Sequence, residues 1–240
     1  MQAPHRSLRS PGRRIRMTTT NASAHTTDIL LIRHGETAWN AERRLQGHLD
    51  IPLNAEGERQ AALLAGALRH EPIDLIVASD LQRARQTAQA VADVRGQAVA
   101  IDAALRERGY GGFEGLLYSE IEARFPREFA AWQARDVDAV LPAGRNRGES
   151  FRAFYDRATG AILGLAAAHP GRTIAIVAHG GVLECAYRLA RSLPLETPRD
   201  FKVYNASINR FRFDPAAGGL ALSSWGEVGH LRPAVLDELP

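Results

Sequence analysis

The sequence predicts an α/β protein of three layers, in which a mostly parallel β-sheet lies between two layers of helices. Short apolar runs rich in branched residues alternate with segments of helical periodicity along most of the chain. The 240 residues are enough to bury one substantial core. Two strand-like runs near the C-terminus, joined by residues 214–219, predict an antiparallel hairpin at one edge of the sheet.

Three apolar runs in the first half of the chain are predicted to be buried strands, because each is short and contains branched residues. They span residues 28–33, 74–79 and 99–105. The spacing of alanines and leucines predicts helices over residues 56–68 and 81–94. Asn54 is the candidate N-cap of the first helix, and Ser79 or Asp80 that of the second.

The second half of the chain continues the alternation of helices and strands. Residues 118–135 carry aromatic side chains at helical spacing, interrupted at Pro126, and we interpret residues 116–149 as a helical lid insertion. The aromatic side chains of this lid are expected to pack in a core. Three further elements are predicted, namely a helix over 150–168, a strongly β-branched strand over 173–179 and a helix over 180–193.

The charge distribution divides the chain into a short tail and one domain. The formal net charge is +3, but residues 1–27 carry five arginines and no acid, which leaves 25 basic and 27 acidic residues in the remainder. We therefore predict a disordered basic tail over residues 1–27 and a single domain over residues 28–240. The tail lacks the apolar segment of about 7–15 residues that a secretory signal contains.

Composition argues against several classes of partner. The basic excess belongs to the tail, so nucleic acid is not an expected partner, and no apolar run approaches the roughly 18 residues that a membrane helix needs. The single cysteine, Cys185, is expected to be a packing residue and fits a reducing cytoplasm. His48, His70, His169 and His230 are expected at the surface, without metal-ligand spacing. The oligomeric state stays open, with a homodimer as one option.

Chemically active side chains follow each of four predicted strands at its carboxyl end. They are Arg33-His34-Gly35, then Ser79-Asp80 with Arg83, then Arg106-Glu107-Arg108, and finally His179-Gly180-Gly181. In a parallel sheet these ends meet at one edge, where ligand sites form. Guanidiniums suit the oxygens of a phosphate, and helix N-termini add positive partial charge. We interpret this constellation as a phosphoryl pocket that contains a nucleophile.

His34 is the candidate nucleophile of this pocket. A neutral imidazole can attack phosphorus and form a covalent intermediate, which divides the transfer into two easier steps. Arginines would stabilise the charge on the equatorial oxygens of the transition state. The leaving alkoxide needs a proton, and Glu107 is the nearest carboxylic acid, with Glu36 and Glu114 as competitors.

The order of these motifs resembles that of the histidine phosphatase superfamily, which has the phosphoglycerate-mutase-like fold. The resemblance rests on RHGETAWN, LQGHLDIPLNAEG, SDLQRARQTA, the glutamate of LRERGYGGFEG, GES and AHGG. These elements occur in the family's order from about residue 28 to the C-terminal hairpin. Six ordered elements that end in a second histidine after a β-branched strand make the resemblance specific.

The resemblance implies a role for each matched residue. The catalytic set would be His34 as the phosphorylated residue, Glu107 as the proton donor, and Arg33, Arg83 and His179 as phosphate ligands. The substrate-binding set would be Gly35, Thr37, Asn40, Gln46, Gly47, Tyr110 and Gly180. No metal and no other cofactor is implied, and the expected partner is a small phosphate ester.

Within this family the sequence favours a phosphatase that acts on small phosphorylated metabolites, with cofactor-dependent phosphoglycerate mutase as the alternative. RLQG after the RHG motif resembles phosphatases, and residues 115–148 lack the proline-rich insertion typical of such mutases. In contrast, ERGYGGFEG has the spacing and several residues of the mutase pattern. A third hypothesis is a non-catalytic module that binds a phospho-ligand, which the presence of a nucleophile and an acid disfavours.

Overall fold

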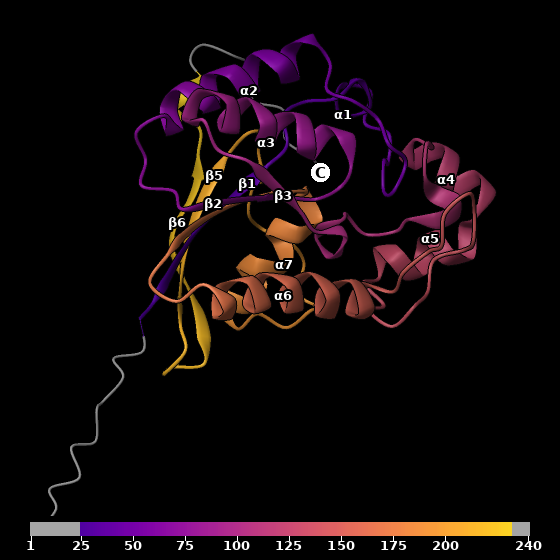
Figure 1. Ribbon diagram of the computed structural model, residues 1–240. Helices are drawn as coiled ribbons and strands as arrows, with labels where there is room; N and C mark the ends of the chain where they lie inside the picture. Colours follow the sequence, from indigo (N-terminus) through magenta and orange to yellow (C-terminus); the bar gives the residue numbers. More distant parts are fainter. Residues whose placement is uncertain (1–24, 232–240) are drawn as a thin grey trace, which may run out of the picture.

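A six-stranded mixed sheet forms the centre of the computed structural model, which describes residues 25–231 (Figure 1). The strands are β1 (Thr27–Arg33), β2 (Leu75–Ala78), β3 (Val99–Ile101), β4 (Thr173–Ala178), β5 (Ile208–Asp214) and β6 (Gly219–Glu227). Their order across the sheet is β3-β2-β4-β1-β5-β6. The first four of these are parallel, whereas β5 and β6 form an antiparallel hairpin at the edge. The predicted α/β fold with an edge hairpin is confirmed.

Helices cover both faces of the sheet (Figure 1). One face carries α2 (Ala55–Leu68) and α3 (Gln82–Arg95), and the other carries α6 (Phe151–Ala168) and α7 (Gly180–Arg191). Leu30 and Ile32 of β1 pack in the cluster beneath α2 and α3. Ile29 and Leu31 pack in the cluster beneath α6 and α7. Because β1 is buried on both sides, its sequence is a continuous apolar run rather than an alternating one.

Two short helices, α4 (Tyr118–Arg124) and α5 (Pro126–Gln133), lie beyond the carboxyl ends of the strands and form the predicted lid (Figure 1). Phe113, Ile121 and Leu141 form the centre of a separate small core, around which the lid aromatics pack. Trp132 stacks on Tyr118 with ring centroids 5.4 Å apart. The expected packing of the lid aromatics is therefore confirmed.

The predicted ends of the third strand and of the tail are wrong. β3 ends at Ile101, because the Asp102 carboxylate caps a 3-10 helix over Ala103–Leu105 immediately afterwards. Thr27 belongs to β1 rather than to the tail, and its buried hydroxyl donates a hydrogen bond to the Ala166 carbonyl. Most of the predicted disorder concerns residues 1–24, which lie outside the described residues. It also concerns the two residues that precede β1.

The predicted N-cap of α3 is also wrong. Leu81 is the N-cap and has extended backbone angles, without a side-chain hydrogen bond. The Ser79 hydroxyl instead lies 2.9 Å from Nε2 of His179, and the Asp80 carboxylate pairs with Arg106. The side chains of both predicted caps thus contact residues at the ends of other strands. Local sequence does not reveal these contacts.

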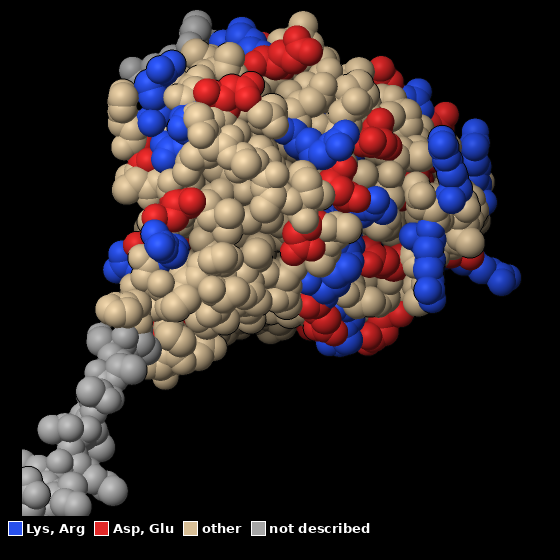
Figure 2. All heavy atoms as spheres, viewed as in Figure 1, with Lys and Arg blue, Asp and Glu red and all other residues tan. Residues whose placement is uncertain are grey.

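The packing role expected for Cys185 agrees with its place in the structure. Cys185 is completely buried in the core beneath α6 and α7, and burial raises the pKa of its thiol well above the usual value. None of the helices within residues 25–231 is long and apolar enough to cross a membrane. On the face shown in Figure 2, basic and acidic side chains are interspersed.

The loop after β1 packs tightly against the start of α2. A Cβ added to Gly57 would overlap the carbonyl of Glu36, and a Cβ added to Gly35 would lie 2.5 Å from the carbonyl of Gly57. Asn54 caps α2 through its carbonyl oxygen and donates its amide to the Glu36 carboxylate at 2.7 Å. This close contact of backbones fixes the loop that begins at His34.

We expect Gly57→Ala to destabilise the protein by about 1–3 kcal/mol, because the new methyl group must displace the Glu36 backbone. Gly66→Ala is the matched control on the same helix, since an added Cβ there has no atom within 4 Å. It should be neutral or stabilising by up to about 1 kcal/mol. Denaturant unfolding of both variants tests this, and a Gly57→Ala variant as stable as the wild type would contradict it.

Candidate active site

The carboxyl ends of the two central strands bring His34 and His179 together. The parallel pairing of β1 with β4 aligns Arg33 with Ala178, so the residues that follow them are neighbours. The two imidazole centroids lie 5.2 Å apart. Both rings are buried, and the chain therefore places two histidines that are far apart in sequence in one site.

The hydrogen bond of His34 indicates which of its ring nitrogens can act as a nucleophile. Nδ1 lies 2.7 Å from the carbonyl oxygen of Gly35. Because a carbonyl only accepts, Nδ1 carries the hydrogen, and the lone pair of the neutral ring is on Nε2. Burial, followed by the positive charges of Arg83 and Arg33, holds the pKa of His34 well below its usual value. His34 is consequently a neutral base at neutral pH.

His179 occupies the equivalent place at the end of β4. Its Nε2 lies 2.9 Å from the Ser79 hydroxyl at the end of β2. Its Nδ1 is buried and has no hydrogen-bond partner among residues 25–231. Burial, and then the positive charge of Arg83, hold its pKa well below the usual value. A buried polar atom of this kind is costly unless a ligand completes its hydrogen bonding.

Two buried guanidiniums accompany the histidines. Arg33 donates through Nη1 to the Val203 carbonyl at 2.6 Å. Arg83 donates to the carbonyls of Leu49 and Gly47 at 2.9 and 2.8 Å, whereas its Nε has no partner among the described residues. Desolvation lowers the pKa of Arg83 to about 10, so it stays protonated at neutral pH. Buried cations held by neutral carbonyls create a site suited to an anion.

Glu107 lies where this cationic site meets a cavity. Its two carboxylate oxygens accept the backbone N–H groups of Arg108 at 2.8 Å and of Gly181 at 2.9 Å. The second donor belongs to the N-terminal turn of α7, whose dipole attracts negative charge. These two bonds fix the carboxyl group between the loop after β3 and the helix after β4.

The competing carboxyl groups have other partners. Glu36 accepts the Asn54 amide, and Glu114 accepts the backbone N–H of His48 at 2.9 Å and the Asn146 amide at 2.7 Å. Neither of them lines the cavity, whereas Glu107 does. The geometry therefore supports the choice of Glu107 as the candidate acid.

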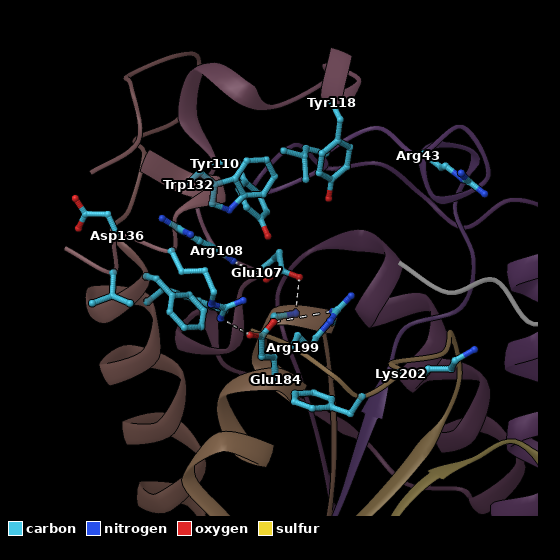
Figure 3. Close-up of a pocket in the computed structure, with 18 of the residues that line it drawn as sticks. Arg43, Glu107, Arg108, Tyr110, Tyr118, Trp132, Asp136, Glu184, Arg199 and Lys202 are labelled. Carbon is cyan, nitrogen blue, oxygen red and sulfur yellow. Dashed lines mark hydrogen bonds and ion pairs between the residues drawn. The ribbon is translucent and has the colours of Figure 1, made fainter. Parts of the chain in front are cut away.

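The cavity next to Glu107 has a volume of about 570 Å³ and extends towards the lid (Figure 3). Glu107 and Gly180, the residue that follows His179, line it, and the lid contributes Tyr118 and Trp132. The Tyr110 phenol also lines it, and burial raises its pKa well above the usual value, so the phenol stays protonated. Arginines also line the cavity: Arg43, Arg44, Arg108, Arg135 and Arg199. A ligand with an anionic group suits the arginines, and Phe151, Phe154 and Phe201 add apolar walls.

Three further predicted residues lie in the loop after β1. Thr37 is the N-cap of the short helix α1 (Ala38–Ala41), where Thr37 and Asn40 each bond the other's backbone N–H at 3.1 Å. The N–H of Gly35 donates to the Thr87 hydroxyl at 3.0 Å. These contacts explain the residues structurally, and their roles in substrate binding stay predictions.

Gln46 and Gly47 lie beside Arg83. Oε1 of Gln46 is buried and has no hydrogen-bond partner within the described part of the chain. Gly47 has a φ of 52°, and an added Cβ would overlap the Glu114 carboxylate, so glycine is required there. The Gly47 carbonyl is one of the two that hold Arg83 in place.

Sequence reasoning missed Asn205 and misplaced His48. Asn205, just before β5, donates its buried amide to the His34 carbonyl at 3.0 Å and to Asn40 Oδ1 at 3.3 Å. Nothing in the local sequence distinguishes it from a turn residue. The prediction that His48, His169 and His230 are surface residues is wrong, because each is partly buried, whereas His70 is exposed as predicted. Nε2 of His48 lies 2.8 Å from the carbonyl oxygen of Glu107, and Nε2 of His230 lies 3.0 Å from that of Ala206.

The site contains no group of three or more His, Cys, Asp or Glu side chains that could hold a metal ion, as far as residues 25–231 are concerned. Its charge comes from guanidiniums and a helix N-terminus. The arrangement combines a neutral imidazole nucleophile, buried cations and a carboxyl group at the edge of a cavity. These are the parts that transfer of a phosphoryl group to nitrogen requires.

Comparison with known sequences identifies the family. Residues 29–227 match the histidine phosphatase superfamily, branch 1. The chain belongs to this superfamily. Phosphoglycerate mutase-like protein 4 from Arabidopsis thaliana is 40% identical over 207 residues, which are 85% of this chain and 86% of that protein.

Solved structures of histidine phosphatases share the fold of this chain. YhfR from Bacillus stearothermophilus has a TM-score of 0.76 and 34% identity, covering 86% of this chain and 100% of that one. The mycobacterial glucosyl-3-phosphoglycerate phosphatase has a TM-score of 0.72 and 29% identity, and the match covers 85% of this chain and 100% of that one. The names of these relatives include both mutase and phosphatase, so membership in the superfamily leaves the choice between the two activities open.

Because His34 and His179 are buried, we expect the stability of the folded protein to fall in mild acid. Their imidazoles stay neutral in the folded protein, whereas in the unfolded chain they take up protons below about pH 6.5. The unfolded state then binds more protons, so the free energy of unfolding decreases as pH falls from about 6.5 towards the lowered pKa values. Each histidine contributes a slope of up to about 1.4 kcal/mol per pH unit.

Urea unfolding between pH 7.5 and 5.5, in buffers without phosphate, measures this slope. His179→Gln should flatten it, because one buried titrating group is removed. His70→Gln, at an exposed position, is the control that removes a histidine outside the site. Equal slopes for the wild type and His179→Gln would contradict the expectation.

Proposed function

We propose that the protein is a phosphomonoesterase that hydrolyses small phosphorylated metabolites through a phosphohistidine at His34. The observation that carries the proposal is the lone pair of neutral His34 within a site that also holds two buried arginines, together with Glu107 at the wall of a cavity. The single buried cysteine supports the reducing cytoplasm as the compartment in which it acts.

The first step transfers the phosphoryl group to the enzyme. Nε2 of His34 attacks phosphorus, the bond between phosphorus and the ester oxygen breaks, and that oxygen takes a proton from the acid form of Glu107. The guanidiniums of Arg33 and Arg83 stabilise the charge on the equatorial oxygens. The orphaned Nδ1 of His179 is one of the atoms that a phosphate in the site can satisfy.

The second step returns the enzyme to its starting state. The Glu107 carboxylate takes a proton from a water molecule while the water oxygen attacks phosphorus. The bond between phosphorus and Nε2 of His34 breaks, which releases inorganic phosphate and leaves a neutral imidazole. Glu107 is then in its acid form again, so protons and charge balance over the cycle.

Hydrolysis rather than isomerisation is the function that the cavity supports better. A mutase has to keep water from the phosphohistidine until the phosphoryl group returns to a bound isomer. Here the proposed proton donor Glu107 lines a cavity of about 570 Å³, which leaves room for water. The phosphatase name of the mycobacterial structural neighbour supports the same choice.

A cofactor-dependent phosphoglycerate mutase is the second candidate, because the Arabidopsis relative carries a mutase-like name. Incubation with 3-phosphoglycerate and a trace of 2,3-bisphosphoglycerate distinguishes the two activities. We expect release of inorganic phosphate to exceed formation of 2-phosphoglycerate. Rapid isomerisation with little phosphate release would overturn the proposal in favour of the mutase.

Replacement of the nucleophile provides the most direct test of the mechanism. His34→Ala should abolish turnover of p-nitrophenyl phosphate and the acid-labile incorporation of phosphate into the protein, since no other group supplies the covalent step. Rapid quenching with a labelled phosphate ester measures both. Substantial residual turnover would reject His34 as the nucleophile, and tight phosphate binding by the wild type without turnover would support the binding module.

A further inference from the structure

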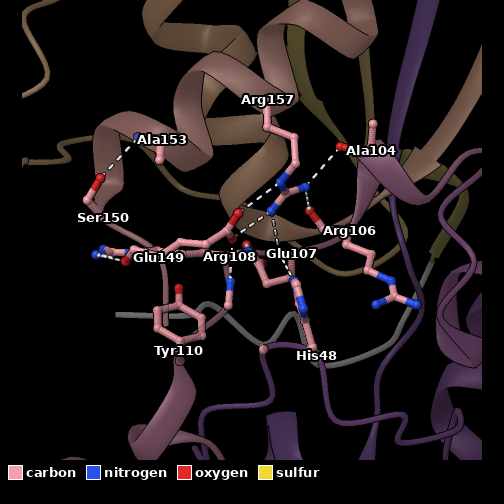
Figure 4. A network of polar contacts seen from close by, with 12 residues as sticks. His48, Ala104, Arg106, Glu107, Arg108, Tyr110, Glu149, Ser150, Ala153 and Arg157 are labelled. Atoms are coloured by element: carbon pink, nitrogen blue, oxygen red, sulfur yellow. Dashed lines mark hydrogen bonds and ion pairs between the residues drawn. The ribbon is translucent and has the colours of Figure 1, made fainter. Parts of the chain in front are cut away.

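The GES motif, residues 148–150, has no part in the chemistry proposed above, although it lies beside Glu107. Ser150 caps α6 through its hydroxyl. The Glu149 side chain turns instead to the loop that carries Glu107, where it pairs with Arg157 of α6 (Figure 4). The pair is bidentate, with Nε–Oε1 at 3.0 Å and Nη2–Oε2 at 2.7 Å.

Arg157 directs its remaining donors to the backbone before and at Glu107. Its Nη1 donates to the carbonyl oxygens of Ala104 and Arg106, each at 2.9 Å. Its Nη2 also donates to the carbonyl of Glu107 at 3.1 Å. His48 reaches the same Glu107 carbonyl from the other side of the loop, with Nε2 at 2.8 Å (Figure 4).

Glu149 holds the backbone after Glu107. Its Oε2 accepts the N–H of Gly109 at 2.7 Å, and its own N–H donates to the Gly109 carbonyl at 2.8 Å. Its carbonyl accepts Nε and Nη2 of Arg108 at 3.1 and 2.9 Å. A Cβ at Gly109 would overlap the Arg147 carbonyl, so only glycine allows the two segments to lie this close.

The position of the Glu107 carboxyl depends on these contacts. Residues 106–109 form neither helix nor strand, so no backbone ladder holds them. The carboxyl itself bonds to the N–H groups of Arg108 and Gly181, which belong to the loop and to α7. A shift of the loop relative to α7 would therefore move or release the carboxyl.

We propose that Glu149 and Arg157, together with His48, are positioning residues that hold Glu107 where it protonates the leaving oxygen. This rests on the proposed function, since it requires Glu107 to be the proton donor. A displacement of about 1 Å in a positioned catalytic group is enough to slow a reaction strongly. None of these contacts involves His34, so their loss affects proton transfer more than nucleophilic attack.

The dependence of the rate on the leaving group tests this assignment. p-Nitrophenolate leaves almost without a proton, whereas the glycerol alkoxide of β-glycerophosphate needs one. We expect Arg157→Met to lower kcat on β-glycerophosphate by about 10- to 100-fold. This is less than the roughly 10²- to 10⁴-fold that a general acid contributes in full, because the acid is displaced rather than removed. The loss on p-nitrophenyl phosphate should be several times smaller, and Glu149→Gln should show the same pattern more weakly.

A matched control removes an equivalent ion pair elsewhere. Arg210 of β5 pairs with Glu71 through two hydrogen bonds of 2.6 and 3.3 Å, and it does not line the cavity. Arg210→Met should lose stability without changing the ratio of the two rates.

If Arg157→Met does not fold, Arg157→Lys is the second variant. It keeps a charge for Glu149, but its single ammonium cannot reach three carbonyls, so it should still shift the ratio.

Combination with Glu107→Gln separates this inference from the proposed function. Glu107→Gln alone should slow β-glycerophosphate far more than p-nitrophenyl phosphate, and adding Arg157→Met should then change the ratio little. If Glu107→Gln slows both substrates equally, Glu107 is not the acid and the proposed chemistry fails. If Glu107→Gln discriminates between the substrates but neither Arg157→Met nor Arg157→Lys does, the contacts of Glu149, Arg157 and His48 are merely structural and our inference is overturned. The same conclusion follows if the losses caused by Glu107→Gln and Arg157→Met multiply.

Discussion

The pairing of β1 with β4 is the constraint on which the site depends. Its parallel register sets Arg33 beside Ala178, so His34 and His179 leave the sheet at the same point. A slip of one residue would turn one imidazole to the opposite face of the sheet. Apolar side chains on both faces of β1 prevent this slip, because each alternate residue fills a different core. The chemistry is thus held by the same packing that holds the fold.

Burial then determines the electrostatic character of the site. Both imidazoles are kept neutral by desolvation and by the neighbouring guanidiniums, which is the state in which nitrogen can attack phosphorus. Arg83 keeps its charge, because desolvation lowers its pKa only to about 10, and two backbone carbonyls accept hydrogen bonds from its N–H groups. The positive charge left over favours a phosphate dianion, and the same charge raises the cost of protonating His34 or His179.

The two halves of the proposed reaction are supported in different ways. His34 follows a central strand and is held by the hydrogen bonds of the sheet and by Asn205. Glu107 lies on a loop without regular structure, so its position depends on side chains from α6 and from the segment around His48. A carboxyl group on a loop can approach a substrate at the mouth of a cavity, but it needs this separate support to stay in place.

The sequence by itself determined the α/β class, the strands and the residues that follow them, because strand periodicity and strand ends are local properties of the chain. The parallel geometry then places Arg33, His34 and His179 at one edge without further information. Only the tertiary structure decided that Asn205 supports His34, that β3 ends early, and that Arg157 reaches the Glu107 loop. These contacts join segments distant in sequence through side-chain hydrogen bonds, which no local pattern records. The cavity likewise depends on contacts between distant segments, such as the ion pair of Arg135 in the lid region with Glu184 of α7.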